Sequence, residues 1–318
     1  MDARLTGLTA CLALVLAGVL AGCAGSALDG GDHPLAGRIY RVADGMPVSE
    51  AQLVADAAEA DFVLLGERHD NPEHHRLQAR LVAALQQRSE APRAVAFEMI
   101  PAWRQLEIVE YLAADGDPAG LAEVVAWDAS GWPEWAWYQP IAEAALASDA
   151  QIVAADLSMA EKRATFVRGA QALRPVFVQR TGLGEPWPAP MMVALQDELR
   201  AAHCDRIPGS LVIGMMRVQR ARDAMMADRL AVASGRGGGI LIAGNGHVRN
   251  DRGVPWYLAR LRPGARSLSI GLLEVQDEAS QPRTDLPYDY VWFTPRVDEA
   301  GEPCDVHDAE LRRLLHAG

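Results

Sequence analysis

The chain has 318 residues, half of them apolar, and a formal net charge of −12. This length fits one large domain or two small ones, and the apolar half is enough for a full hydrophobic core. The acidic balance comes without any dense run of lysine or arginine, so we expect no nucleic-acid partner.

The first 22 residues have the pattern of a bacterial lipoprotein signal. Their apolar stretch, residues 8–20, is too short to cross a membrane comfortably. It ends in Leu20-Ala21-Gly22-Cys23, which resembles a lipobox, the motif whose cysteine receives lipid. We therefore expect a signal peptide over 1–22, a lipid anchor on Cys23 and a tether over 23–37. Ala24 favours the outer membrane, and an ordinary secretory signal with an incidental cysteine is the alternative.

Two cysteines remain after the anchor, Cys204 and Cys304. In an oxidising periplasm they could pair, but two cysteines alone do not show that they lie close together. No CxxC or zinc-ribbon spacing is present.

Short apolar runs alternate with helical patterns along the rest of the chain. The expected strands are 61–65, 94–97, 152–155, 240–243 and 268–275, then a late strand in "YDYVWFTPR" before a small helix in "HDAELRRLLH". Helices are expected from the capping box Ser49-Glu50-Ala51-Gln52, from Asn71-Pro72-Glu73, and over Gly209–Ala233. This alternation predicts an α/β fold, with a mostly parallel sheet covered by helices on both faces.

Two segments depart from the alternation. Residues 116–147 hold four of the eight tryptophans, Trp127, Trp132, Trp135 and Trp137, together with Tyr138. Residues 180–208 are rich in proline and methionine. We expect both to belong to a mainly helical layer, inserted at about 110–210 in a single domain over 38–318.

Polar side chains follow three of the expected strands. Glu67 and His69 follow the first strand, Glu98 ends the second, and His247 follows a later one. In open parallel sheets, sites form beyond the carboxyl ends of the strands, so these side chains should converge. Each residue alone has a structural alternative, such as a helix cap or a surface histidine. Two Gly-x-x-His units, each directly after an apolar strand, favour a shared site.

The chemistry of this set is narrow. Two imidazoles and two carboxylates suit Zn, Mn or Co, and an open metal position would activate water. The metal ligands would then be His69, His247, Glu67 and Glu98. Alternatively, Glu67 or Glu98 would act as a general base. No Gly-x-Ser-x-Gly motif supports a serine hydrolase.

Other polar and sulfur-containing residues have simpler interpretations. We expect His74 and His75, on the first turn of a helix, to be solvated. The recurring Arg217, Arg220 and Arg222 would form a solvated face, although Arg220 or Arg222 with Asp223 could reach the strand-end site. The methionines Met215, Met216, Met225 and Met226 suit the core.

Several of these motifs together resemble one family. They are "GERHDNPEHH", "FEM", "HC", "VQRARDAMMA" and "LIAGNGHVRNDRGVP". The chain resembles the ChaN lipoproteins, which belong with Tiki, TraB and erythromycin-esterase-like proteins, over about residues 38–296. The resemblance implies haem binding in iron uptake, by a tyrosine ligand assisted by a histidine, with stacked haems at a homodimer interface. The tyrosine role would fall on Tyr138, in "WPEWAWYQP", and the histidine role on His69 or His247.

The wider group also implies an alternative. Tiki-like relatives are metal-dependent peptidases that use residues like Glu67, His69, Glu98 and His247. Whether the chain is an enzyme therefore stays open, with a metal-dependent hydrolase as the alternative to haem binding.

Physical chemistry permits haem without the resemblance. A tyrosinate oxygen suits ferric haem, and Arg249 or Arg252 could pair with the propionates. Trp132, Trp135 and Trp137 could wall the macrocycle, although such a cluster usually packs in a core. No CxxCH is present for covalent haem attachment.

Overall fold

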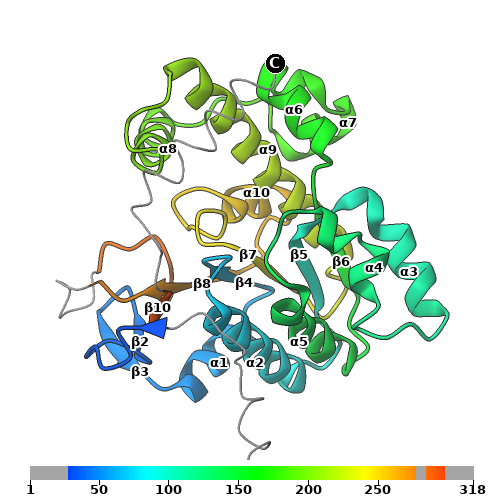
Figure 1. The fold of residues 1–318 in the computed structure, drawn as a ribbon, viewed down its shortest axis with the longest axis vertical. Helices are drawn as coiled ribbons and strands as arrows, with labels where there is room; N and C mark the ends of the chain where they lie inside the picture. The colour runs from blue at the N-terminus through cyan, green and yellow to red at the C-terminus, as the bar shows by residue number, and fades with distance from the viewer. Residues whose placement is uncertain (1–27, 277–283, 298–318) are drawn as a thin grey trace, which may run out of the picture.

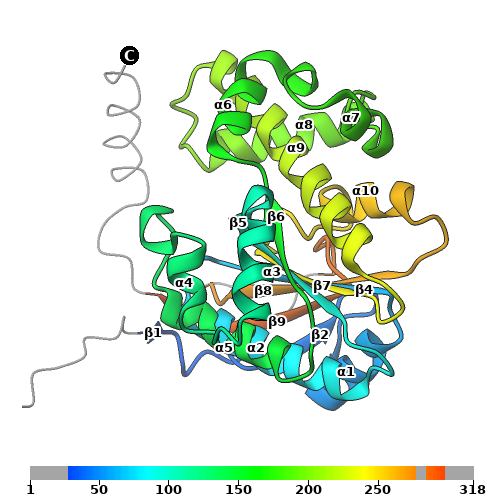
Figure 2. The same ribbon diagram turned by 90° about the vertical axis from the view of Figure 1, so that its right-hand side faces the viewer.

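The computed structural model describes residues 28–276 and 284–297, and its centre is an eight-stranded sheet with helices on both faces (Figures 1 and 2). The strands lie in the order β3-β2-β9-β8-β4-β7-β5-β6. Six of them are parallel: β9 (Tyr290–Thr294), β8 (Ser267–Glu274), β4 (Phe62–Glu67), β7 (Gly239–Gly244), β5 (Ala94–Pro101) and β6 (Ile152–Asp156). The antiparallel edge consists of β2 (Ile39–Arg41) and β3 (Met46–Val48). A separate pair joins β1 (Leu28–Asp29) to β10 (Arg296–Val297).

Side chains of the central strands alternate between two hydrophobic cores. In β4, Val63 and Leu65 pack into the core on one face, and Phe62 and Leu64 into the core on the other. Strands β5 and β7 divide their side chains in the same way. Because helices cover both faces, these strands are apolar at nearly every position, which explains the short continuous apolar runs in the sequence.

Each face of the sheet has its own set of helices. The first face carries α1 (Glu50–Ala58), α2 (Pro72–Arg88), α3 (Gln105–Ala113), α4 (Leu121–Val124) and α5 (Trp135–Leu146), with the short helices η1 (Ala102–Arg104) and η2 (Trp127–Ala129). The second face carries α6 (Met159–Arg168), η3 (Gly169–Ala172), α7 (Pro175–Thr181), α8 (Ala189–Ala201), α9 (Gly209–Ala233) and α10 (Val254–Leu261). The predicted fold class is therefore confirmed.

The structure also differs from the expected layout. Segment 110–210 is mainly helical, but β6 divides it, so α3 to α5 lie on one face and α6 to α8 on the other. Cys204 is disulfide-bonded, and Cys304 lies outside the described residues, as do Cys23, the expected tether up to residue 27 and the expected C-terminal helix. Within the described ranges, no helix has the length and apolar character needed to cross a membrane.

Candidate functional site

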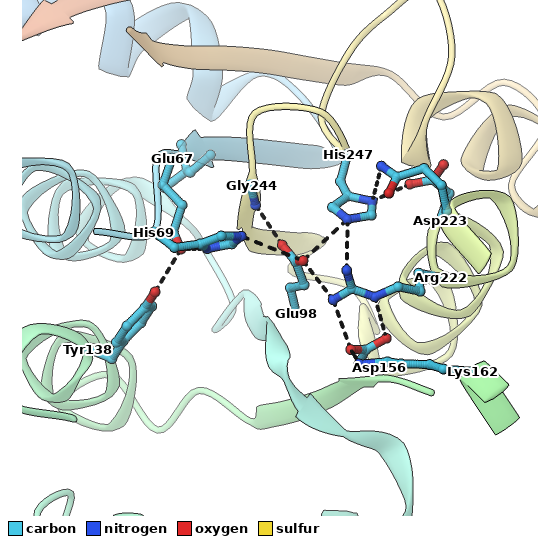
Figure 3. Close-up of polar contacts among 12 residues, drawn as sticks. Glu67, His69, Glu98, Tyr138, Asp156, Lys162, Arg222, Asp223, Gly244 and His247 are labelled. Carbon is cyan, nitrogen blue, oxygen red and sulfur yellow. Dashed lines mark hydrogen bonds and ion pairs between the residues drawn. The ribbon is translucent and has the colours of Figure 1, made fainter. Parts of the chain in front are cut away.

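The carboxyl ends of four neighbouring parallel strands hold a cluster of charged side chains (Figure 3). Glu67 is the last residue of β4 and Asp156 the last of β6. Glu98 lies in β5, and His247 follows β7. Parallel strands end at the same edge of a sheet, so residues distant in the chain meet there.

Glu98 is at the centre of this strand-end site. The pairing of β5 with β6 shifts register between Phe97 and Pro101, and such an irregularity re-aims a side chain. Its Oε2 accepts a hydrogen bond from the Gly244 amide at 2.6 Å, and its Oε1 accepts one from Arg222 at 2.7 Å. Glu98 is therefore held from two sides.

Two histidines face Glu98 from opposite directions (Figure 3). His247 Nε2 lies 3.2 Å and His69 Nε2 lies 3.9 Å from Glu98 Oε1. A second carboxylate fixes each ring, since His247 Nδ1 lies 2.5 Å from Asp223 and His69 Nδ1 lies 2.7 Å from Glu67. Binding at Nδ1 sets the tautomer and directs both Nε2 atoms into the site.

Glu67 is fully enclosed behind His69. Its Oε1 accepts a hydrogen bond from the Tyr138 hydroxyl at 2.9 Å, and its Oε2 lies 3.1 Å from His75 Nδ1. The other ring nitrogen of His75 donates to the carbonyl of His69 at 2.9 Å. Both the side chain and the backbone of His69 are thus held by buried groups.

Arg222 supplies positive charge at the centre of the site. It bonds both oxygens of Asp156 at 2.9 Å, and Lys162 lies 2.5 Å from the same carboxylate. Burial raises the pKa of Glu98, but His247 and Arg222 outweigh it and hold that pKa well below its ordinary range. Burial in turn lowers the pKa of His247, yet Glu98 and Asp223 prevail and raise it to about 9.

The same balance acts at the other histidine. Burial lowers the pKa of His69, but the Glu98 and Glu67 carboxylates raise it above its ordinary value. Burial raises the pKa of Glu67, and His75 and His69 nevertheless bring it below its ordinary value. Both glutamates therefore stay ionised, and each stabilises a histidine side chain in its position.

Glycine at position 244 leaves room for His69. A Cβ there would lie 3.0 Å from His69 Nε2 and 3.6 Å from Glu98 Oε2. At position 66, a Cβ would lie 2.2 Å from Asn245 Oδ1. The first glycine of each Gly-x-x-His unit thus leaves space for a close side chain of the site.

The structure brings together several of the site residues that the sequence predicts. Glu67, His69, Glu98 and His247 do converge, and Arg222 with Asp223 reaches them. Tyr138 is fully buried and its hydroxyl donates to Glu67, while burial raises its pKa. In this arrangement the phenol oxygen lies in the interior and donates its hydrogen to Glu67.

The structure corrects the expected exposure of two histidines. The expectation that His74 and His75 are solvated is wrong: both are fully buried, and their ring nitrogens bond the loop 68–69 and Thr294.

Arg249 pairs with Asp251 and Glu198. Trp132 packs edge-on against the His69 ring, at 4.7 Å between centroids.

Sequence reasoning missed two charged residues of the site. Asp156 is the last residue of β6, and it follows an apolar run just as Glu98 does in β5. The position of Asp156 at a strand end could therefore have identified it from the sequence. Lys162 has no such signal, because it reaches Asp156 from the second turn of α6.

The donor set does not form a metal site. Within the described ranges, no three His, Cys, Asp or Glu side chains are arranged to hold a metal ion. The carboxylates face Arg222, Lys162 and the imidazoles, so resident cations balance the charge that a metal would neutralise. The divalent-metal alternative is therefore not supported.

Comparison with known proteins identifies the family. The family profile described as "Haem-binding uptake, Tiki superfamily, ChaN" matches residues 53–258, more than half of the chain. A solved structure described as cofacial heme binding to ChaN of Campylobacter jejuni is similar in fold. It has a TM-score of 0.63 and 20% identity, and the match covers 80% of this chain and 95% of that chain. The type III effector HopBA1 has a TM-score of 0.43 and 15% identity, with 83% and 99% covered. No curated protein matches. The chain belongs to the ChaN family of haem-binding uptake proteins in the Tiki superfamily.

Proposed function

We propose that this protein binds haem at the mouth of the strand-end site and serves haem or iron acquisition at the bacterial cell envelope. The observation that carries the proposal is the arrangement of His69 in a chain that belongs to a haem-binding family. Its side chain is 32% exposed, whereas the side chains of Glu67 and Glu98 are 0% and 1% exposed. Among the clustered ligands that the sequence predicts, His69 thus has the most exposed side chain, since that of His247 is 6% exposed.

The residues around His69 fit haem. Its Nδ1 is anchored to Glu67, which leaves Nε2 as the nitrogen for iron, and an imidazole backed by a carboxylate is a common haem or metal ligand arrangement. Trp132 adds an apolar ring beside it. Haem would supply a ferric iron to which this chain contributes a ligand and an apolar wall.

Tyr138 has a different role in this proposal. Its hydroxyl donates to Glu67, which in turn fixes His69, so Tyr138 acts behind the ligand. The raised pKa of His69 means that iron competes with a proton for Nε2. Haem binding through this atom should therefore weaken as the pH falls.

A haem titration with two variants tests the ligand assignment. The purified protein is titrated with ferric haem and followed by its Soret band. We expect His69→Gln to weaken binding by roughly tenfold or more and to shift the band, since removal of one ligand bond costs well over 1.4 kcal/mol. Tyr138→Phe should keep the ligand and lose only its hydrogen bond to Glu67.

The opposite pattern would contradict the assignment. Phenolate charge-transfer bands that vanish in Tyr138→Phe and persist in His69→Gln would make Tyr138 the ligand. Wild-type protein that leaves the haem spectrum unchanged would refute the haem proposal itself.

We further propose that the protein is anchored by lipid on Cys23 in the outer membrane and forms a homodimer. The anchor is supported by the lipobox sequence. The dimer is supported by an exposed apolar row, Trp103, Leu106 and Val109, on η1 and α3, directly after β5. A second copy is the partner we infer, because the ChaN structure of Campylobacter jejuni is described as binding heme cofacially.

A second candidate function is hydrolysis by acid–base catalysis. It is favoured by the two carboxylate-fixed histidines whose Nε2 atoms face one carboxylate oxygen. In this arrangement Glu98 is a weak base because its pKa is lowered, so the partly exposed His69 is the better group for proton transfer.

An assay on a panel of activated esters and peptides tests this candidate. We expect activity to survive a chelator, and to fall by roughly 100-fold or more in His69→Gln and His247→Gln. His33→Gln, a histidine outside the site, is the control. Activity that requires an added metal, or that both variants retain, would rule out this mechanism.

A further inference from the structure

The loop after His247 contains two arginines that share one internal carboxylate. Arg249 Nη1 lies 3.2 Å from Glu198 Oε2, and Arg252 Nη2 pairs with the same oxygen. Glu198 belongs to α8, whereas both arginines precede α10. One carboxylate of the helical layer thus bridges two guanidinium groups at the edge of the site.

Arg252 has unused capacity to donate hydrogen bonds. Its side chain is 3% exposed, and its Nη1 lies 3.5 Å from Asp251 with no hydrogen-bond partner. A buried donor without an acceptor costs free energy. Guanidinium groups match both oxygens of a carboxylate, but Glu198 makes both contacts through Oε2. Arg249 uses its Nε and Nη2 for Asp251, so the spare donor of the pair is Arg252 Nη1. A carboxylate that uses both of its oxygens could take this donor, which Glu198 does not.

Glu198 lies next to the strand-end site. A Cβ at Gly246 would lie 3.7 Å from both Glu198 Oε1 and Gln219 Nε2. Gln219 in turn lies 3.2 Å from His247 Nδ1. Glu198 therefore lies on the His247 side of the strand-end site.

Glu198 is also weakly held. Its side chain is 42% exposed, so water screens its charge more than that of Arg252, whose side chain is 3% exposed. The helix that carries it, α8, has a single fully buried side chain, Leu195. Few buried contacts make a segment easy to displace.

We propose that Arg249 and Arg252 form a recognition site for a ligand carboxylate, which Glu198 occupies in the ligand-free protein. The inference rests on the proposed function, because the carboxylates of haem are its two propionates. A propionate displaces Glu198, and α8 then loses its polar link to the loop of the site. Glu198 therefore lowers haem affinity and makes binding selective for porphyrins with free carboxylates.

Four proteins and two probes test this proposal. Wild type, Glu198→Gln, Arg249→Gln and the control Asp197→Asn are titrated with ferric haem and with its dimethyl ester. Asp197 is an exposed acid next to Glu198, so the control changes net charge equally. We expect Glu198→Gln to raise haem affinity roughly three- to tenfold, Arg249→Gln to lower it similarly, and Asp197→Asn to leave it unchanged. None should change affinity for the ester.

The outcomes separate this inference from the proposed function. Haem binding that is equal in wild type and Glu198→Gln, or an equal gain for the ester, overturns the inference and leaves haem binding intact. A gain in Asp197→Asn as large as in Glu198→Gln assigns the effect to net charge and also overturns it. Absence of haem binding in all four proteins overturns both proposals.

Discussion

At the scale of single residues, the site depends on paired charges that compensate one another. Arg222 lies between Glu98 and Asp156, and each histidine has one carboxylate at Nδ1. Buried charges are tolerated only when paired and hydrogen-bonded, so removing one partner leaves another without compensation. This coupling makes protein stability depend on the protonation of His247.

The pH dependence of unfolding tests that coupling. The pKa of His247 is about 9 in the folded protein against 6.5 ordinarily. A raised pKa stabilises the folded state fully below pH 6.5, and the stabilisation is lost as the pH rises through 9. A shift of this size corresponds to roughly 3 kcal/mol. We expect the free energy of unfolding to fall between pH 6.5 and 9, and much less so in His247→Gln. Equal slopes in both proteins would contradict the charged His247.

At the scale of elements, the start of α2 fixes the loop that carries His69. Asn71 is fully buried and caps the helix by accepting from the Glu73 amide at 3.0 Å. Its amide also donates to Glu274 at 2.7 Å and to the Pro295 carbonyl at 3.0 Å. One side chain therefore caps a helix and ties the loop to the region of β8 and β9.

Two cap variants separate these contributions. Ser49 caps α1 on the surface and accepts only from the Gln52 amide among its described contacts. We expect Ser49→Ala to lower the free energy of unfolding by about 1 kcal/mol. Asn71→Ala should cost roughly 2–4 kcal/mol, because it also removes the hydrogen bonds to Glu274 and to the Pro295 carbonyl. Chemical denaturation measures both, and equal losses would show that the links to Glu274 and Pro295 contribute nothing.

At the scale of the whole molecule, exposed apolar side chains follow strand β5 on η1 and α3. Trp103 is 55% and Leu106 65% exposed, and both lie beyond the strand that carries Glu98. Exposed apolar side chains scattered singly are normal, whereas several spaced three residues apart along η1 and α3 favour an interface.

Haem-dependent assembly tests the proposed dimer. We expect added haem to double the mass measured by sedimentation or light scattering, and Trp103→Glu to keep the protein monomeric. Val232→Glu, at a site 64% exposed on α9, is the matched control and should still assemble. A mass that haem does not change, or equal effects of the two variants, would contradict an interface at Trp103.

The sequence by itself determined the fold class and the strand-end positions of the site. Apolar runs over 61–65 and 240–243 are confirmed as strands because burial on both faces leaves few polar positions in them. Since parallel strands end together, Glu67, Glu98 and His247 were placed correctly from their positions alone.

Only the tertiary structure decided burial and partners. His74 and His75 look solvated in a polar stretch, but their ring nitrogens bond groups that the fold brings from elsewhere in the chain. Tyr138 follows a tryptophan-rich stretch, yet the packing of α5 on α2 places its hydroxyl beneath Glu67. Arg222 takes the central cation position through contacts 66 and 124 residues away. Such pairings depend on which side chains the fold brings together across the sheet. The neighbouring residues in the sequence do not show which distant residues these partners will be.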